Sequence, residues 1–239
     1  MQDVLDLHTH TLASGHAYNT IWEMAEAASK KGLKLLGITE HAPKMPGTCH
    51  EYYFSNLKVV PREIYGVQVL FGAELNIIDT EGHVDLPQSI LSDMDVTIAS
   101  LHLPCFSPAT EEENTQAYLN AMKNPLIHII GHPDDGRYPV DYKRLVLGAK
   151  EHHVLLEIND SSLNPKGFRC DTAANDRKML ELCKEYKVPV ILGSDAHVRT
   201  DVGAHKRAQA LLTEMNFPEE LVVNRSVEAV MEFLKKKSN

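Results

Sequence analysis

Histidine and acidic side chains recur at the ends of short apolar segments, and their types and spacing could hold metal ions. The chain has 239 residues, of which 13 are histidines. The first apolar segment runs into His8 and His10, and residues two apart on a strand project from the same face. His16 follows in the first loop, where a small-residue segment lets the chain fold back over the strand end. Five later segments end in further candidate ligands, which are His41, Glu74, His102, His132, and the pair Asp195 and His197.

This set of donors is typical of a polynuclear metal site. Imidazole and carboxylate ligands suit zinc, iron or manganese, and the set contains no thiolate. A single histidine is more often packed or exposed than a ligand, and we interpret six others in that way: His50, His83, His128, His152, His153 and His205. Nine ligand-type side chains at successive strand ends are harder to explain without metal, because burying unpaired polar groups is costly.

Seven short apolar runs predict the strands that position these side chains. They span residues 4–7, 35–39, 67–75, 96–101, 127–131, 154–158 and 190–193. Because the runs are continuously apolar, both faces should be buried, as in a parallel sheet. Predicted helical segments cover residues 20–31, 110–122, 141–152, 173–186, 201–215 and 226–236, and residues 87–92 fit either a short turn or a helix. The region 43–66 shows no clear crossover helix, and within it residues 51–65 fit either a helix or a loop followed by a helix.

Strands and helices that alternate in this number favour a barrel over an open sheet. We therefore predict an α/β fold, a seven-stranded (β/α)7 TIM-like barrel, with residues 1–239 as a single domain. In such barrels the carboxyl ends of the strands carry the chemistry. The nine candidate ligands all lie at or just beyond these ends.

Composition and charge disfavour several other classes of protein. The 24 basic and 33 acidic residues give a formal net charge of −9, which disfavours sequence-independent nucleic-acid binding. No apolar window is long enough to span a membrane, and the first residues lack the pattern of a signal peptide. We therefore expect a cytoplasmic protein with no membrane partner. The four cysteines form no C-x-x-C pair, so we expect them to be reduced packing residues.

The motifs as a set resemble those of the polymerase-and-histidinol-phosphatase (PHP) superfamily, and most closely its small stand-alone bacterial phosphatases. The segments that carry the resemblance are Asp6-Leu7-His8-Thr9-His10-Thr11, Ser14-Gly15-His16-Ala17-Tyr18, Ile38-Thr39-Glu40-His41, Gly72-Ala73-Glu74-Leu75-Asn76, Ser100-Leu101-His102, Gly131-His132-Pro133, Leu156-Glu157-Ile158-Asn159 and Gly193-Ser194-Asp195-Ala196-His197. Glu40 is a departure, since many members have an aspartate there. That position is not a ligand in the family pattern, so we expect it to act only through its neighbours.

The resemblance implies a distorted seven-stranded barrel that holds three divalent metal ions. We expect zinc first, with manganese or iron as alternatives. By analogy with the family, the ions are held by three sets of side chains: His8, His10, Glu74 and Asp195 for the first; His16, His41 and His197 for the second; and Glu74, His102 and His132 for the third, with Glu74 bridging.

A cluster of this kind suits the hydrolysis of small phosphomonoesters. We expect a metal-bridging hydroxide held by His8, His10, Glu74 and Asp195, with no serine or cysteine nucleophile. The substrate would be a small anion, and its phosphate would be clamped by arginines that follow strand ends. The candidates are Arg169, which we expect first, and then Arg137 and Arg199. The barrel could also form a homo-oligomer.

Three other functions are left open by the residues. An amidohydrolase-type C–N hydrolase also begins with H-x-H, but it usually adds a bridging lysine at a mid-barrel strand end, which no strand end here offers. A PHP-type exonuclease or phosphodiesterase is disfavoured by the acidic charge. A non-catalytic metal scaffold is disfavoured because structural zinc sites are usually closed and often contain thiolates.

Overall fold

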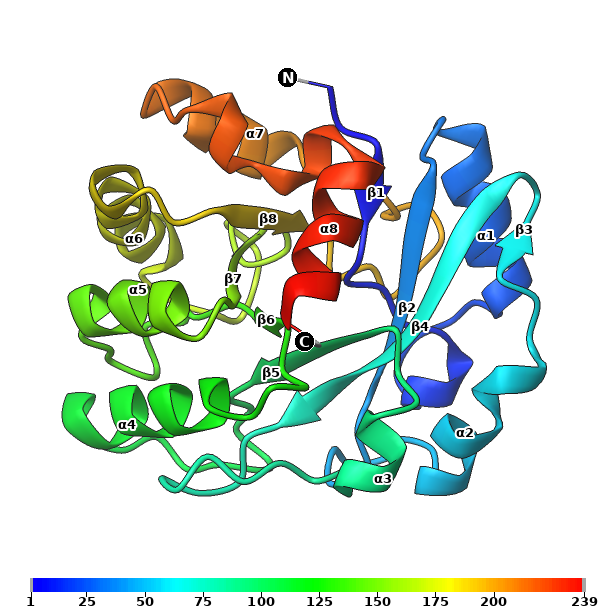
Figure 1. Ribbon diagram of the computed structural model, residues 1–239, viewed down its shortest axis with the longest axis horizontal. Coiled ribbons are helices and arrows are strands. Elements are labelled where there is room, and N and C mark those ends of the chain that lie inside the picture. The colour runs from blue at the N-terminus through cyan, green and yellow to red at the C-terminus, as the bar shows by residue number, and fades with distance from the viewer. Residues whose placement is uncertain (1, 238–239) are drawn as a thin grey trace.

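Seven parallel strands form a nearly closed barrel in the computed structural model, which describes residues 2–237 (Figure 1). In order around the barrel these strands are β1 (Leu5–Asp6), β2 (Leu35–His41), β4 (Val67–Asn76), β5 (Val96–Ser100), β6 (Ile129–Ile130), β7 (Leu155–Asn159) and β8 (Val190–Gly193). The predicted seven-stranded α/β barrel is confirmed, and the strand ends differ from the prediction by at most two residues.

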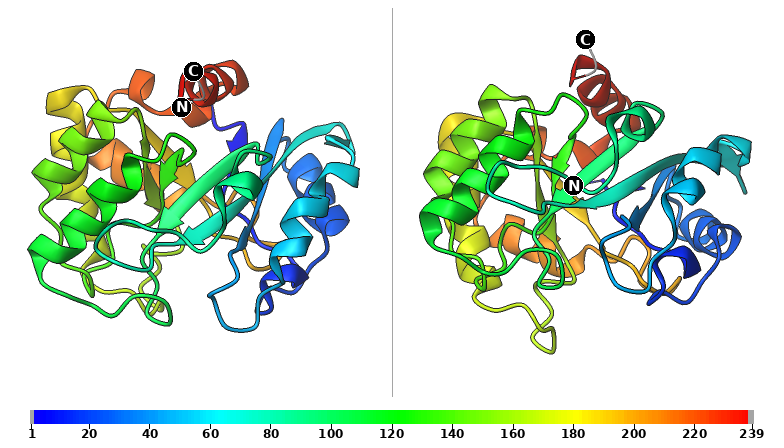
Figure 2. Two further views of the ribbon diagram at one scale, coloured as in Figure 1. Left: turned by 60° about the horizontal axis from the view of Figure 1, so that its bottom comes forward. Right: turned by 90° about the horizontal axis from the view of Figure 1, so that it is seen from below.

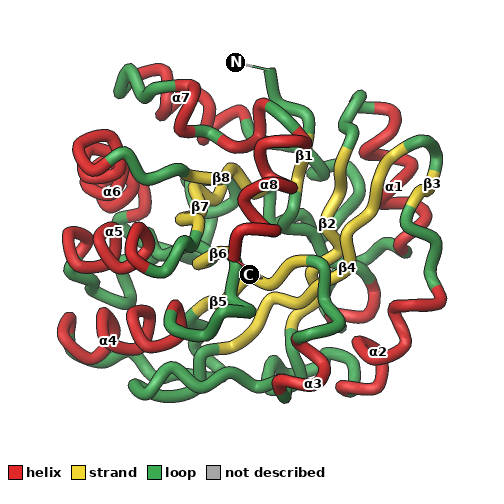
Figure 3. Tube along the Cα trace, viewed as in Figure 1, coloured by secondary structure: helices red, strands yellow, loops and turns green. Residues whose placement is uncertain are grey.

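Helices cover the outside of the barrel (Figure 3). They are α1 (Ile21–Lys30), α2 (Glu51–Asn56), α3 (Gln88–Leu91), α4 (Glu111–Met122), α5 (Tyr142–Glu151), α6 (Thr172–Tyr186) and α7 (Lys206–Glu214), and a last helix, α8 (Val227–Lys237), lies across one end of the barrel. Two of these helices begin with a capping box, which is formed by Thr20 with Glu23 in α1 and by Thr110 with Glu113 in α4. No helix within residues 2–237 is long and apolar enough to cross a membrane.

Two predicted segments differ from the structure. The unassigned region contains α2, a short 3-10 helix (Leu57–Val59) and an extra strand, β3 (Glu63–Ile64), which pairs antiparallel with β4. Residues 201–205, predicted to be helical, form turns instead, and Gly203 there has a φ of 65°. Helix α7 begins later than predicted because the Asp160 carboxylate accepts hydrogen bonds from the backbone N–H groups of Arg207 and Ala208, in the first turn of this helix.

The interior of the barrel is divided along its axis. Its amino-terminal half is filled by apolar side chains from every parallel strand, among them Leu5, Leu35 and Ile98. Val230, Phe233 and Leu234 of α8 pack against the same cluster and close that end. In Figure 2 α8 lies at one end of the barrel, and long loops gather at the other. The polar side chains of the barrel interior are therefore confined to the carboxyl-terminal end.

Asn224 closes the gap between the first and last strands. Its side-chain amide donates to the carbonyl groups of Leu5 in β1 and Leu192 in β8, and its Oδ1 accepts from the Leu192 N–H at 2.7 Å. Farther along the strands, Thr9 and Ala196 form a parallel bridge. These contacts hold the segments that carry His8, His10 and Asp195 side by side without a continuous strand ladder.

A buried ion-pair network supports the same junction. His205 Nδ1 lies 2.7 Å from Asp3 Oδ2, and His205 Nε2 lies 3.5 Å from Asp6 Oδ1. Burial alone would lower the pKa of His205, but the carboxylates of Asp6 and Asp3 outweigh burial and raise this pKa to about 10. Asp6 also accepts hydrogen bonds from the backbone N–H groups of Ser194 and Gly203. The charged His205 thus holds β1 against the segment that follows β8.

The variant His205→Gln should unfold more easily, by about 3 kcal/mol at pH 6, because it leaves buried carboxylates without their cation. The pKa of His205 is raised by folding, so its charge stabilises the fold fully below the unfolded value near 6.5, and this stabilisation is lost as the pH rises to about 10. Urea unfolding between pH 6 and pH 10 should show the difference between the two proteins shrinking. His83→Gln, at an exposed histidine, is the control. A difference that does not depend on pH would contradict the charged pair.

Candidate metal centre

The fully buried carboxylate of Glu74 lies at the carboxyl-terminal end of the barrel, and five imidazoles surround it. Glu74 belongs to β4, and the register of the sheet pairs it with His41 of β2. The ring nitrogens nearest to its two oxygens are His41 Nδ1 at 2.8 Å, His132 Nε2 at 2.9 Å, His102 Nε2 at 3.2 Å, His8 Nε2 at 3.4 Å and His10 Nε2 at 3.6 Å. One acid from a central strand thus gathers five histidines from four other segments.

The remaining candidate acid, Asp195, faces the same cluster from the end of β8. Its Oδ1 lies 3.4 Å from His10 Nε2 and 3.7 Å from His8 Nε2. The same oxygen lies 3.5 Å from Nδ1 of the nearby His197.

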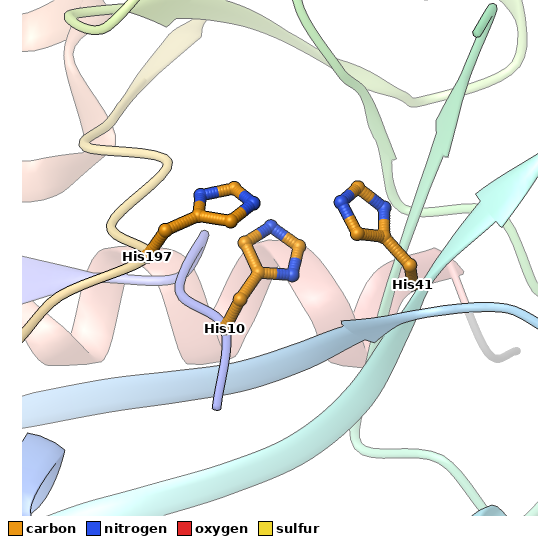
Figure 4. Close-up of side chains that lie close together, drawn as sticks. All are labelled: His10, His41 and His197. Atoms are coloured by element: carbon orange, nitrogen blue, oxygen red, sulfur yellow. The ribbon is translucent and has the colours of Figure 1, made fainter. Parts of the chain in front are cut away.

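The rings of His16 and His197 complete the cluster on its outer side. The His16 ring lies 4.8 Å from that of His41 and 4.9 Å from that of His197, measured between centroids. Figure 4 shows His10, His41 and His197 converging from three separate segments. The structure therefore brings all nine predicted ligands to one place.

Unpartnered buried atoms provide a test of whether a metal fits. His8 Nε2, His10 Nε2 and Glu74 Oε2 are buried without a hydrogen-bond partner among the described residues. One donor atom from each of these three residues lies within 4.8 Å of the others, and the same holds for two overlapping groups, His10 with His41 and His197, and His41 with Glu74 and His102. Buried polar atoms normally have partners, and a divalent cation would supply one here. The residues present therefore fit metal ions.

The other nitrogen of several rings is held in place, as is common for metal-ligating histidines. Each of these nitrogens faces an oxygen of a side chain or the backbone: His8 Nδ1 faces Glu157 Oε1 at 2.6 Å, His10 Nδ1 faces Ser14 Oγ at 3.2 Å, His102 Nδ1 faces Asn76 Oδ1 at 2.7 Å, and His197 Nδ1 faces the Asp195 carbonyl at 3.0 Å. These contacts turn the Nε2 atoms toward the cluster and fix the ring orientations.

The roles of Glu157, Asn76 and Ser14 were not identified from the sequence. A signal was present for two of them, because a polar side chain inside an otherwise apolar strand must point at a polar partner. Asn76 lies two residues after Glu74, and therefore on the same face of β4. Ser14 lies in a loop, where strand periodicity gives no direction.

Glu40 acts through its neighbours, as expected from the sequence. Its Oε2 accepts hydrogen bonds from Ser14 Oγ at 2.6 Å and from the Thr11 N–H at 3.0 Å. Ser14 in turn contacts His10 and accepts a hydrogen bond from the His41 N–H. The longer glutamate side chain therefore supports two candidate ligands without reaching the cluster itself.

Burial and neighbouring charges set the ionisation of the cluster. Burial would raise the pKa of Glu74, but the charges of His102, His8 and His41 outweigh it and hold this pKa well below its usual value. Burial lowers the pKa of His102 to about 4, and burial with His41 and His197 lowers the pKa of His10. Burial would also lower the pKa of His8, but the carboxylates of Glu157, Glu74 and Asp195 outweigh burial and raise this pKa well above its usual value. The low pKa of Glu74 and the lowered pKa values of His10 and His102 favour the protonation states in which such side chains bind metal.

Two candidate ligands have an uncommon backbone conformation. His132 has a φ of 30° and Asp195 a φ of 54°, both in the left-handed region. Residues other than glycine are strained there, and such strain is often found at functional sites. The turn at each strand end points the side chain inward over the barrel mouth.

A pocket of about 440 Å³ opens over the cluster, and two of the three candidate arginines line it. Arg169 is nearly buried, and its Nη1 and Nη2 each donate to Asp195 Oδ2 at 3.1 Å. Arg137 is partly exposed, and its Nε donates to Asp135 Oδ1 at 2.9 Å. The structure does not bring Arg199 to the pocket, since its exposed side chain lies 3.9 Å from Glu26 on α1.

Comparisons with known proteins agree with the motifs. Residues 6–162 match the family model described as PHP domain. A protein of Clostridium novyi (strain NT) named "Probable phosphatase" is 48% identical over 237 residues, which cover 99% of this chain and 96% of that protein. Another "Probable phosphatase", from Caldanaerobacter subterraneus subsp. tengcongensis, is 48% identical over 98% of this chain and 92% of its own length.

Two solved structures share the fold at low sequence identity. Histidinol phosphate phosphatase from Lactococcus lactis, complexed with zinc, L-histidinol and phosphate, has a TM-score of 0.60 at 17% identity, over 90% of this chain and 95% of its own. A chain of archaeal ribonuclease P, solved with mature tRNA, also has a TM-score of 0.60, at 16% identity over 98% of this chain and 91% of its own. At these identities the likeness extends to the fold alone.

The variant Glu157→Gln should bind zinc about 10- to 100-fold more weakly, which is the usual effect of losing the partner of a ligating histidine. The carboxylate that faces His8 Nδ1 is lost, although the size of the side chain is kept. Competition with a fluorescent zinc chelator measures the change. Glu214→Gln, the same exchange at an exposed acid of α7 that pairs with Arg177, is the control. Equal zinc affinity in native protein and Glu157→Gln would show that this contact does not support metal binding.

Proposed function

Because the chain belongs to the PHP domain family, we propose that it hydrolyses small phosphomonoesters with three divalent metal ions bound at the carboxyl-terminal end of its barrel. The predicted enzyme class, a hydrolase of phosphoric esters, is confirmed by full-length relatives named as probable phosphatases. The main support for the proposed metal site and reaction is the position of the Glu74 carboxylate among five imidazoles. Buried atoms of His8, His10 and Glu74 itself have no hydrogen-bond partner among the described residues.

The proposed ligand sets follow the family pattern and the contacts around Glu74. They are His8, His10, Glu74 and Asp195 for the first ion, His16, His41 and His197 for the second, and Glu74, His102 and His132 for the third. The contact of His10 with His41 and His197 supports close spacing of the first two positions. Zinc is our first choice, since the donors are nitrogen and oxygen and zinc is bound in the histidinol phosphate phosphatase of similar fold. Manganese and iron are the alternatives.

When bound, such ions supply a water of lowered pKa and neutralise the charge of the phosphoryl group. The chain itself orients the reacting groups. The two hydrogen bonds from Arg169 occupy Asp195 Oδ2, so that Oδ1 remains directed at His8 and His10. Arg137 presents its guanidinium at the partly exposed wall of the pocket, where it can bind a phosphoryl oxygen. Arg169 and Arg137 are therefore the proposed phosphate-binding residues.

The contacts give no support to the other functions. Among the described residues that line the pocket there is no lysine that could bridge two ions as in the amidohydrolases. In the proposed ligand sets Glu74 bridges two ions instead. The net charge of −9 remains unfavourable for a nucleic-acid substrate. The cytoplasmic location, the homo-oligomer and the single domain over residues 1–239 stay predictions.

Protein purified without chelator should contain three divalent ions per chain and hydrolyse p-nitrophenyl phosphate. Glu74→Gln should bind fewer ions and lose about 100-fold or more of the activity, since it removes a ligand and not only the partner of one. Elemental analysis and the phosphate-release assay are done on the same samples. Fewer than two ions per chain after reconstitution would contradict the cluster. A fully loaded sample that hydrolyses an amide but no phosphomonoester would contradict the proposed reaction.

Arg137→Ala should raise KM for a small phosphomonoester about tenfold and change kcat little, because it removes a phosphate contact without touching a proposed ligand. Metal content should be unchanged. The matched control is Arg177→Ala, at an exposed arginine of α6 that pairs with Glu214. Steady-state kinetics at saturating metal measure both constants. An unchanged KM would remove Arg137 from the site.

A further inference from the structure

The pocket above the candidate metal ligands has an apolar wall that the proposed chemistry does not require. Nine of its lining residues are candidate ligands, arginines or Ser161, and the other five are apolar: Met45, Leu101, Leu103, Pro104 and Phe168. Leu101 is buried, but Leu103 is 46% exposed and Phe168 is 75% exposed. Exposed apolar side chains that gather in a concave site are typical of ligand recognition.

Phe168 is held at the pocket although most of its surface is exposed. Its ring centroid lies 5.2 Å from the Arg137 guanidinium carbon and 5.3 Å from that of Arg169, which are cation–π distances. Both arginines are fixed independently of the ring, Arg169 by Asp195 and Arg137 by Asp135. The two proposed phosphate-binding groups therefore place an aromatic surface directly beside the phosphoryl position.

The pocket offers few partners for a polar leaving group. Once the candidate ligands and the two arginines are assigned to metal and phosphate, Ser161 is the only polar side chain left among the described lining residues. A sugar or polyol phosphate would bring several hydroxyl groups against Met45, Leu103 and Phe168. Hydroxyl groups that lose water without gaining a partner lower the affinity. An aromatic leaving group would instead cover apolar surface of the pocket.

We propose that the substrate is a phosphomonoester of an aromatic or similarly flat, apolar alcohol, with Phe168 as the specificity-determining residue that packs against the leaving group. This inference rests on the proposed phosphatase function. In the reaction, water adds its oxygen to phosphorus as the bond from phosphorus to the ester oxygen breaks. The leaving oxygen takes up a proton, so the products are the alcohol and inorganic phosphate.

Benzyl phosphate and glycerol 3-phosphate provide a kinetic test, because both release primary alcohols. The metal-loaded native protein should show a kcat/KM at least about tenfold higher for benzyl phosphate, as expected when an apolar pocket selects between leaving groups. Phe168→Ala should lower kcat/KM for benzyl phosphate about fivefold or more, mainly through KM, and should leave that for glycerol 3-phosphate within about twofold. Phe168→Tyr, which keeps the ring, should restore the preference.

Binding of non-hydrolysable analogues gives a second measurement, which does not depend on turnover. Calorimetry should show that benzylphosphonate binds the metal-loaded protein more tightly than 2,3-dihydroxypropylphosphonate does, with a more negative heat-capacity change. The difference should largely disappear in Phe168→Ala. The matched control is Tyr52→Ala, which removes an aromatic side chain of α2 that is also 75% exposed but does not line the pocket.

The outcomes separate this inference from the function on which it rests. If glycerol 3-phosphate is hydrolysed as well as benzyl phosphate, or if Phe168→Ala affects both substrates equally, the apolar leaving group is wrong and the phosphatase function stands. If neither ester is hydrolysed, the proposed function fails. In that case equal binding of the two phosphonates would also overturn the assignment of an aromatic ligand to this pocket.

Discussion

The burial of one ionised carboxylate among five imidazoles is the constraint on which this structure depends. Glu74 has no access to solvent, and the ring nitrogens around it lie 2.8 to 3.6 Å from its oxygens. Such a group is expensive to remove from water unless charges and hydrogen bonds compensate. The barrel provides the compensation by ending its strands at one level, so that every strand end can direct a polar side chain toward the same point.

The division of the barrel interior into an apolar half and a polar half allows the fold to bury these polar groups. The apolar layer includes side chains from every parallel strand, such as Leu5 and Ile191, and is closed by α8. It fills the amino-terminal half of the barrel and forms a rigid base for the polar layer. At the junction of β1 and β8, Asn224 and the His205 ion pairs replace a strand ladder with side-chain contacts. The contacts of Asn224 and His205 therefore hold the segments that carry His8, His10 and Asp195 beside each other. The apolar layer supports the same segments from the amino-terminal side of the barrel.

Much of this arrangement could be predicted from the sequence, because strand ends and side-chain types are local properties. The continuously apolar runs identified the parallel strands, and the polar residues at or just beyond the ends of these runs identified the cluster around Glu74. The strand β3 was missed because two residues paired antiparallel leave no periodic signal. Arg199 follows a strand end as Arg169 does, yet its side chain turns to Glu26. The direction of a loop side chain depends on tertiary contacts that no spacing reveals.

The supports of the cluster and the pocket were hidden from the sequence for the same reason. Glu157, Asn76 and Ser14 touch rings far away in the chain, so only the fold reveals what they hold. Phe168 gave no signal at all, since a lone aromatic residue in a loop is ordinary. The role that we propose for Phe168 depends on the two arginines that hold its ring beside the proposed phosphate position. The pocket thus has a charged side for the phosphoryl group and an apolar side beside it. A ligand that satisfies both must carry its charge at one end and its apolar surface at the other.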